Sequence, residues 1–262
     1  MRILIIPDLQ VKDGVPLHHI PAIGNYIVDK EPEVIVVIGD LWDMPSLSRF
    51  NSSLELEGQR IQADIDAGKR AVRMLMKPLL SKQARQRANK KAVYKPRLVF
   101  TTGNHDPAVR IPRLIEAYPI LDGMLVDDTT EFLEGFGFEV YPFLEVVEIE
   151  GIRFAHYHVN PHSAKKAPLS GMMDTMLKNA GYSFVAGHTQ GIKMAKHYLA
   201  DGTVRMGIQC GSCYLHDEPY MGVQGNRHWR GVVMLNEVKD GSADICEVSL
   251  NYLIDNYGNQ HE

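Results

Sequence analysis

Cysteine is scarce in this chain of 262 residues, which has three, at Cys210, Cys213 and Cys246. Such an odd, sparse set is unlike the dense, even sets that hold small secreted domains together, so disulfides are not expected and a reducing compartment is favoured. Cys210 and Cys213 have the spacing of half a zinc ribbon, but no second pair exists to complete four ligands. The sequence therefore argues against structural zinc.

Long hydrophobic runs are also absent. No apolar stretch approaches the roughly 20 residues that a membrane-spanning helix needs, and the chain starts with a short apolar segment, without a signal core or cleavage site. The formal net charge of -4 is too small to imply a polyanionic or polycationic partner for the whole surface. We expect a cytoplasmic protein that does not associate with a membrane.

The pattern of apolar residues predicts an α/β fold. Residues 3–6, 34–38, 98–100 and 184–186 form short apolar runs typical of buried strands, and residues 17–29 have apolar residues at helical spacing. The second half is rich in strands, with Asp201-Gly202 and Asp240-Gly241 as turns of two β-hairpins. These features favour two mixed β-sheets packed face to face and flanked by helices, as four layers.

With 45% hydrophobic residues, the chain can bury the core of one large domain over residues 1–262. The long stretch of residues 44–97 separates two predicted core strands. Within it, residues 61–80 alternate apolar and charged residues at helical period. We interpret this stretch as a helical insertion, and we expect a further helix at residues 112–118.

Polar segments follow the predicted strands where each strand ends. They are Asp8-Leu9-Gln10, Gly39-Asp40-Leu41-Trp42-Asp43, Gly103-Asn104-His105-Asp106 and Gly187-His188-Thr189-Gln190. Ligands of open α/β sheets bind at the carboxyl ends of the strands, so these Asp, Asn and His side chains are expected at one sheet edge. The arrangement predicts a metal site.

The order and spelling of these segments, together with His156-Tyr157-His158, resemble the calcineurin-like metallophosphoesterases. This superfamily contains two-metal phosphatases, phosphodiesterases and nucleases, and the resemblance covers most of the chain. It implies the two-sheet fold described above and two metal ions bridged by Asp40. By the family pattern, the first ion takes Asp8, Gln10, Asp40 and Gln190, and the second takes Asp40, Asn104, His156 and His188.

The chain differs from the family's usual motifs at Gln10 and Gln190, where His is common. Both changes fall on the first ion, whose ligands become all oxygen, whereas the second keeps two imidazoles. Oxygen ligands favour hard ions such as Mg²⁺ or Mn²⁺, and imidazole suits Zn²⁺, Fe or Ni²⁺. We expect unequal sites, with Mn²⁺ the ion most able to serve both; a single tightly held ion is the alternative.

Other polar residues have expected supporting roles. His105 would lie beside the metals and protonate the leaving oxygen, with Asp106 orienting it. Asp43 would hold a loop or support a ligand. Strand alternation would put His158 on the same face as His156, where it either contacts substrate or supports a ligand, or simply packs.

One segment is strongly basic and has no acidic residue. It contains Lys82, Arg85, Arg87, Lys90, Lys91, Lys95 and Arg97. At the rim of the cleft, these side chains would track the phosphate backbone of a nucleic acid, and the alternative is a solvated helix end. Three functions remain open: a metal-dependent phosphodiesterase or nuclease, which we favour, a phosphomonoesterase, and a binding module that has lost activity.

Overall fold

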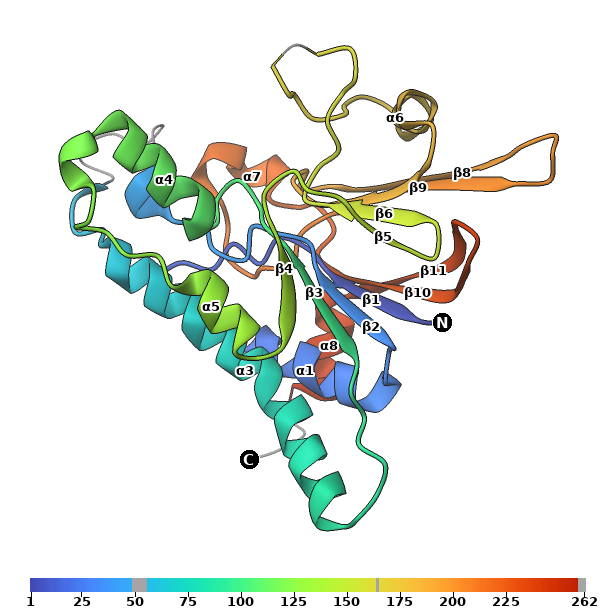
Figure 1. Ribbon diagram of the computed structural model, residues 1–262, viewed down its shortest axis with the longest axis horizontal. Coiled ribbons are helices and arrows are strands. Elements are labelled where there is room, and N and C mark those ends of the chain that lie inside the picture. Colours follow the sequence, from blue (N-terminus) through green and yellow to red (C-terminus); the bar gives the residue numbers. More distant parts are fainter. Residues whose placement is uncertain (49–55, 164, 259–262) are drawn as a thin grey trace.

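The computed structural model describes residues 1–48, 56–163 and 165–258, and it has two mixed β-sheets flanked by helices (Figure 1). The strands are β1 (Ile3–Ile6), β2 (Val34–Val37), β3 (Arg97–Thr101), β4 (Phe138–Tyr141), β5 (Val147–Ile149), β6 (Ile152–Ala155), β7 (Ser183–Ala186), β8 (Ile192–Tyr198), β9 (Val204–Cys210), β10 (Gly231–Lys239) and β11 (Ser242–Ser249). The α-helices are α1 (His19–Lys30), α3 (Ile61–Ala88), α4 (Pro107–Ala117), α5 (Thr129–Glu134), α6 (Met173–Ala180), α7 (Gly222–Gly225) and α8 (Leu250–Tyr257). Short 3₁₀ helices cover Pro45–Leu47, Pro119–Leu121 and Pro219–Met221.

The larger sheet has six strands in the order β11-β10-β1-β2-β3-β4, and the smaller has five in the order β5-β6-β7-β9-β8. In the larger sheet β1 to β4 are parallel neighbours, and β10 pairs antiparallel with β1 and β11. In the smaller sheet β6, β7 and β9 are parallel, and β5 and β8 lie antiparallel at the edges. Both predicted hairpins, β8–β9 and β10–β11, are confirmed.

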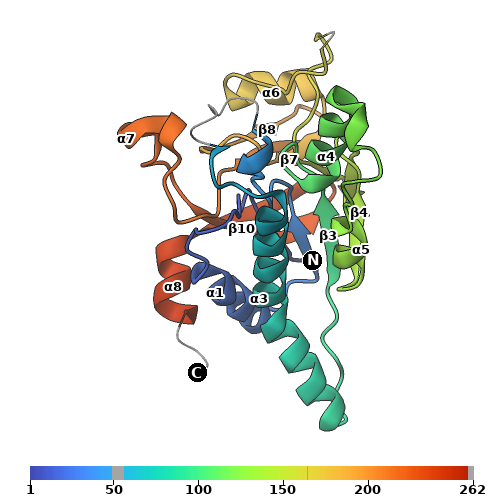
Figure 2. The ribbon, with the colours of Figure 1, turned by 90° about the vertical axis from the view of Figure 1, so that its left-hand side faces the viewer.

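Three apolar clusters show why the elements form four layers. Alternate residues of β1, such as Leu4 and Ile6, pack against α1, α3 and α8, whereas Ile3 and Ile5 face the smaller sheet. The other face of the smaller sheet packs against α6 through Phe184. Each central strand is therefore buried on both faces, which explains its continuous apolar sequence. Figures 1 and 2 show this order of helix, sheet, sheet and helix.

The helix predicted for residues 61–80 extends to Ala88, and its first five turns belong to the outer helical layer. Ile65, Val72 and Leu79 are buried in the cluster shared with α1 and the larger sheet. Beyond this point α3 projects past the sheet, at the bottom of Figure 1. The predicted helix at residues 112–118 is α4, which starts earlier, at Pro107. Among the described residues, no helix is long and apolar enough to span a membrane.

A glycine in α3 lets the segment after β2 pack closely under this helix. Trp42 is 1% exposed, and its indole N–H donates to the carbonyl of Ile65 at 3.2 Å. A Cβ on Gly68 would overlap the indole ring. Since Trp42 lies two residues after Asp40, the position of α3 is coupled to the loop that carries Asp40.

We predict that Gly68→Ala destabilises the protein although alanine is the better helix former. Overpacking of a core lowers the free energy of unfolding by about 1–3 kcal/mol, whereas the higher helix propensity of alanine raises it by only about 1 kcal/mol. Urea unfolding should therefore show a net loss of stability and an altered Trp fluorescence. Gly191→Ala is the control, because a Cβ there has no atom within 4 Å; equal stability of the two variants would contradict the packing role.

Candidate metal centre

Five loops bring the predicted ligands together at one edge of the two sheets. Asp8, Asp40 and Asn104 follow β1, β2 and β3 of the larger sheet, and His156 and His188 follow β6 and β7 of the smaller one. The loops are joined by backbone hydrogen bonds, including the N–H of Gln10 to the carbonyl of Asp40 at 2.9 Å. The candidate centre therefore lies where the carboxyl ends of both sets of parallel strands meet.

Asp40, His156 and His188 form a group that could hold a metal ion, with one ligand atom from each within 4.8 Å of the others. Nε2 of His156 lies 3.3 Å from Oδ2 of Asp40 and 3.0 Å from Oδ1 of Asn104. Nδ1 of His156 is 2.9 Å from the carbonyl of Ile38, to which its N–H donates. That bond leaves Nε2 as the nitrogen that would give up its proton to bind a metal ion, and a backbone partner on the other ring nitrogen is the usual support of a metal-bound histidine.

The ligands expected for a first ion include unpaired oxygens. Oδ2 of Asp8, Oε1 of Gln10 and Oε1 of Gln190 are buried and have no hydrogen-bond partner in the structure. Burying such acceptors without a partner costs free energy. Each of these oxygens is a ligand type that hard divalent cations prefer, so the chemistry of the residues present fits an oxygen-ligated ion.

Electrostatics also favour a cation at this edge, because three carboxyl groups are buried close together. Burial and the charge of Asp40 raise the pKa of Asp8 to about 7, against the opposing effect of the charge of His156. Burial and the charge of Asp40 likewise raise the pKa of Asp106 to about 7. Burial would raise the pKa of Asp40 too, but His156 and His105 hold it well below its usual range.

The two histidines of the group differ in charge. Burial lowers the pKa of His156, but Asp40 outweighs this effect and raises that pKa to about 9. Burial lowers the pKa of His188 to about 4, and the neighbouring charge of His156 adds to the effect. His188 is therefore neutral near pH 7, which is the form that binds metals.

The glycines of the motifs allow the loops to approach one another. A Cβ on Gly103 would overlap the backbone N and Oδ1 of Asp40, and a Cβ on Gly187 would lie 2.5 Å from Oδ1 of Asp8. Gly39 has φ of 88°, and a Cβ there would lie 2.7 Å from Nδ1 of His156. Each glycine thus makes room for a candidate ligand from another loop.

The prediction that Asp106 orients His105 is wrong. The carboxylate of Asp106 accepts hydrogen bonds from the backbone N–H groups of Gly103, Asp40 and Trp42, at 2.7, 3.2 and 3.0 Å. These bonds tie the loop after β2 to the loop after β3. Asp106 is 2% exposed and therefore lies inside the protein, between the two loops. Its hydrogen bonds hold the backbone around Asp40 in place.

Asp43 is the carboxylate that contacts His105. Its Oδ1 lies 2.8 Å from Nδ1 of His105, and its Oδ2 accepts from Nζ of Lys12 at 2.9 Å. Burial would lower the pKa of His105, but Asp40 and Asp43 outweigh this effect and raise it. Nη2 of Arg110 also lies 3.0 Å from Nδ1 of His105. The imidazole is thus held between an acid and a guanidinium beside the candidate ligands.

His158 lies on the other face of the smaller sheet from His156. Strand β6 ends at Ala155, so alternation does not continue through residue 158. The His158 ring packs 5.0 Å from the ring of Phe184, and its Nε2 is 3.2 Å from the carbonyl of Val185. The expected position on the same face as His156 is wrong, and His158 is a packing residue.

The basic segment lies at the opposite edge of the larger sheet from the candidate centre. Tyr94 of this segment donates to the carbonyl of Pro32, just before β2, whereas Asp40 comes after that strand. Lys82 lies about 25 Å along α3 from Ile65, the residue that contacts Trp42, at 1.5 Å per helical residue. The expectation that this segment borders the cleft is therefore wrong, because α3 runs antiparallel to the strands.

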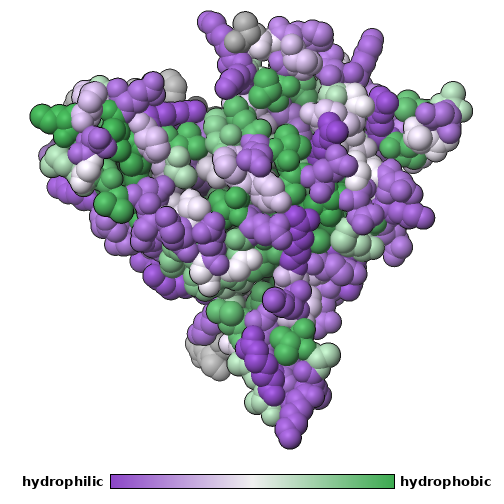
Figure 3. Space-filling model, viewed as in Figure 1, coloured by the Kyte–Doolittle hydropathy of each residue, from purple (hydrophilic) through white to green (hydrophobic). Residues whose placement is uncertain are grey.

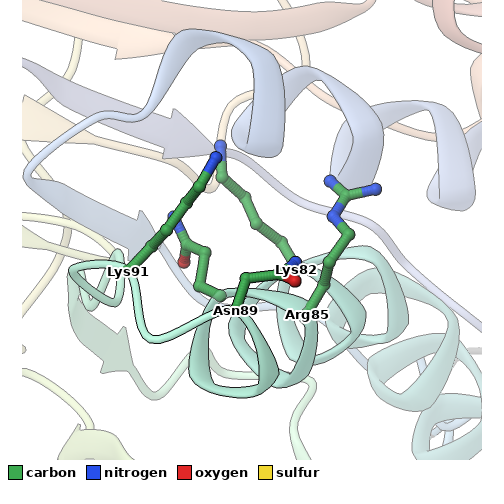
Figure 4. Close-up of a pocket in the computed structure, with 5 residues that line it drawn as sticks. Lys82, Arg85, Asn89 and Lys91 are labelled. Atoms are coloured by element: carbon green, nitrogen blue, oxygen red, sulfur yellow. The ribbon is translucent and has the colours of Figure 1, made fainter.

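A hollow of about 360 Å³ lies beside the end of α3 and is lined by Lys82, Arg85, Gln86, Asn89 and Lys91. In Figure 4 Lys82 and Arg85 extend from α3, and Lys91 extends from the loop after it, toward the neighbouring helix. Lys82 is already paired there, with Glu31 and the carbonyl of Val28. Figure 3 shows that the projecting end of α3, at the bottom, is mainly hydrophilic. The segment thus forms a solvated basic surface.

Sequence reasoning missed several residues at this edge. Lys12 joins Asp43 to Glu218, whose Oε1 lies 2.7 Å from Nζ, and Glu218 comes from the distant loop after β9. Gln209, at the end of β9, donates to Oγ1 of Thr189 beside the candidate ligand His188. The one sequence feature that pointed to Lys12 was its position two residues after Gln10. No local pattern marks Glu218 or Gln209.

The fold and the site together define a two-sheet α/β protein with a candidate metal centre between the sheet edges. No family model matches the chain. The chain is similar to the Gene 54 protein of Mycobacterium phage L5, with 29% identity over 202 residues, which cover 73% of this chain and 71% of that protein. It is 31% identical to the Gene 54 protein of Mycobacterium phage D29 over 204 residues, with the same two coverages. The chain therefore belongs to the family of the mycobacteriophage Gene 54 proteins.

We predict that Asp40→Asn weakens Mn²⁺ binding. Loss of a residue that only supports a metal ligand lowers metal affinity roughly 10- to 100-fold, and loss of a ligand itself should lower it by at least as much. Calorimetric titration of metal-stripped protein measures this, and thermal unfolding gives an independent readout, since bound metal stabilises the native state. The matched control is Asp64→Asn, which removes another buried carboxyl charge, one that accepts from the N–H of Ser46. Equal Mn²⁺ affinity in the two variants would exclude Asp40 as a ligand.

Proposed function

We propose that this protein is a metal-dependent phosphoric ester hydrolase of the calcineurin-like metallophosphoesterase type. One observation carries the proposal. Asp40, His156 and His188, which could hold a metal ion, lie at the same sheet edge as three unpaired oxygens, from Asp8, Gln10 and Gln190. The motif order gives additional support. When bound, divalent cations at such a site lower the pKa of a water molecule and offset charge on a phosphate.

The protein's own side chains supply the remaining chemistry. Nδ1 of His105 donates to Asp43, so Nε2 is the nitrogen that exchanges a proton with the leaving oxygen of the substrate. Asp43 and Asp40 favour the protonated ring, which suits a general acid. Arg110 adds a positive charge beside this imidazole, where the phosphoryl group carries its negative charge.

For the metals, we propose two unequal sites that share Asp40. Oxygen atoms of Asp8, Gln10 and Gln190 form the harder site, and the imidazoles of His156 and His188 with Asn104 form the softer one. Mn²⁺ serves both kinds of ligand, and Mg²⁺, Ni²⁺, Zn²⁺ and Fe are the competing ions. The unpaired oxygens support occupation of the first site, because they have no other partner.

We predict that the double variant Gln10→His, Gln190→His gains affinity for Zn²⁺ relative to Mn²⁺, because both substitutions bring imidazole to the first site. Metal counting on purified protein should give two Mn²⁺ per chain before the change. Gln62→His, on the exposed face of α3, is the control for an added surface imidazole. An unchanged stoichiometry and metal preference in the double variant would exclude the unequal sites.

We predict that His105→Ala lowers kcat by about 10²- to 10⁴-fold, the usual contribution of a general acid. Its Mn²⁺ affinity should stay near that of the natural protein, because His105 is not among the proposed ligands. The assay is hydrolysis of bis-p-nitrophenyl phosphate and p-nitrophenyl phosphate with Mn²⁺. His197→Ala, which removes a histidine on β8 paired with Asp174, is the control.

Two results would overturn the proposed hydrolase. The first is folded, Mn²⁺-loaded protein that cleaves none of these esters, nor single- or double-stranded DNA or RNA. The second is cleavage that persists in Asp40→Asn. Inactivity with intact metal binding would favour a binding module that has lost activity.

A further inference from the structure

An aromatic ring lies beside the candidate metal ligand His188, and a second ring packs against the first. Tyr157 follows His156 directly, and its ring centroid is 4.9 Å from that of His188, tilted by 48°. Phe143, from the loop after β4, packs edge-to-face against Tyr157 with centroids 5.5 Å apart. Both aromatic residues are half-buried, so neither is closed off from solvent. Tyr157 is fixed from two sides, which gives it a defined orientation at the rim of the centre.

A cation from a third element accompanies these rings. The guanidinium of Arg113, on α4, lies 5.5 Å from the centroid of Phe143. Arg113 is exposed, and its charge opposes the burial that raises the pKa of Tyr157. Within residues 1–48, 56–163 and 165–258, no carboxylate forms an ion pair with Arg113. Its charge is therefore available to a ligand anion.

We infer that Tyr157, with Phe143 and Arg113, forms a stacking platform for a nucleobase, and that the substrate is a phosphodiester with a base next to the scissile phosphate. This inference rests on the proposed phosphoric ester hydrolase and names its substrate class. One sugar joins a base to its phosphate, so a base stacked on Tyr157 has its phosphate beside His188. Arg113 binds the next phosphate along the strand. Aromatic stacking is sequence-tolerant, because every base has a π-face.

The alternatives predict a different surface. A phosphomonoesterase that acts on phosphoproteins has no need for an aromatic ring next to the ligand histidine. A site for double-stranded nucleic acid would have its bases stacked within the duplex, out of reach of Tyr157. The half-buried pair of rings therefore points to single-stranded nucleic acid or to nucleotide diesters, in which the base is free to stack.

The test compares two probes of equal charge on the full chain loaded with Ca²⁺. One is a fluorescein-labelled oligothymidylate, and the other has the same number of phosphates but abasic sugars. Anisotropy gives both affinities, and electrophoresis confirms that the probes stay intact. The natural protein should bind the oligothymidylate about 10-fold more tightly, within the range measured for stacking of one base on an aromatic side chain.

Variants of Tyr157 separate stacking from packing. Tyr157→Leu should abolish the preference for bases, measured as the ratio of the affinities of the same variant for the two probes, and Tyr157→Phe should keep that ratio. Tyr198→Leu, which changes an exposed tyrosine on β8, is the matched control. Equal binding of the two probes by the natural protein, or a preference that survives Tyr157→Leu, would overturn the platform.

Hydrolysis separates this inference from the proposed function. With Mn²⁺, the p-nitrophenyl ester of thymidine 5′-monophosphate should have a KM about 10-fold below that of methyl p-nitrophenyl phosphate, and Tyr157→Leu should bring the ratio of the two KM values close to one. If neither ester is cleaved but the base preference in binding persists, the hydrolase fails and the platform stands. If both are cleaved with equal KM, the hydrolase stands and the platform fails.

Discussion

The carboxylate of Asp106 is the constraint on which the geometry of the site depends. It accepts three backbone hydrogen bonds from the loops after β2 and β3, and thereby fixes where Asp40 lies relative to Asn104. A buried acceptor of this kind is strongly held, because its loss would leave three N–H groups unpaired in the interior. The glycines at residues 39 and 103 complete the arrangement by making room between the two loops.

Burial then determines the chemistry of this edge. Asp8, Asp40 and Asp106 are nearly inaccessible to water, so their charges are poorly screened and each carboxyl group affects the others. Inside the protein, the charge of Asp40 is compensated by imidazolium from His156 and His105. A cluster of this composition has a deficit of positive charge, and the unpaired oxygens of Gln10 and Gln190 add acceptors to it. The same features that cost stability in the metal-free protein favour binding of cations.

Much of the fold and most of the ligand set could be predicted from the sequence. Buried parallel strands have continuous apolar runs, and Asp-Gly turns mark hairpins, so both signals are local. The candidate ligands Asp8, Asp40, Asn104 and His188 could be placed at the sheet edge because each comes shortly after a predicted strand, and the resemblance to the metallophosphoesterases added His156. The length of α3 could not be predicted, because its last turns are charged and form a helix that does not pack on the core. The predicted position of His158 was wrong, because the residue at which β6 ends depends on the neighbouring strands in the sheet.

The sequence by itself determined the four-layer α/β architecture and the residues that meet at the sheet edge. Apolar periodicity and the motifs after the strands are local patterns, formed by residues close together in the chain. Only the tertiary structure decided which carboxylate contacts His105, that the basic segment lies away from the centre, and that Tyr157, Phe143 and Arg113 come together. These are contacts between residues far apart in the chain. They depend on the direction of α3 and on how loops from two sheets cross, which no local pattern specifies.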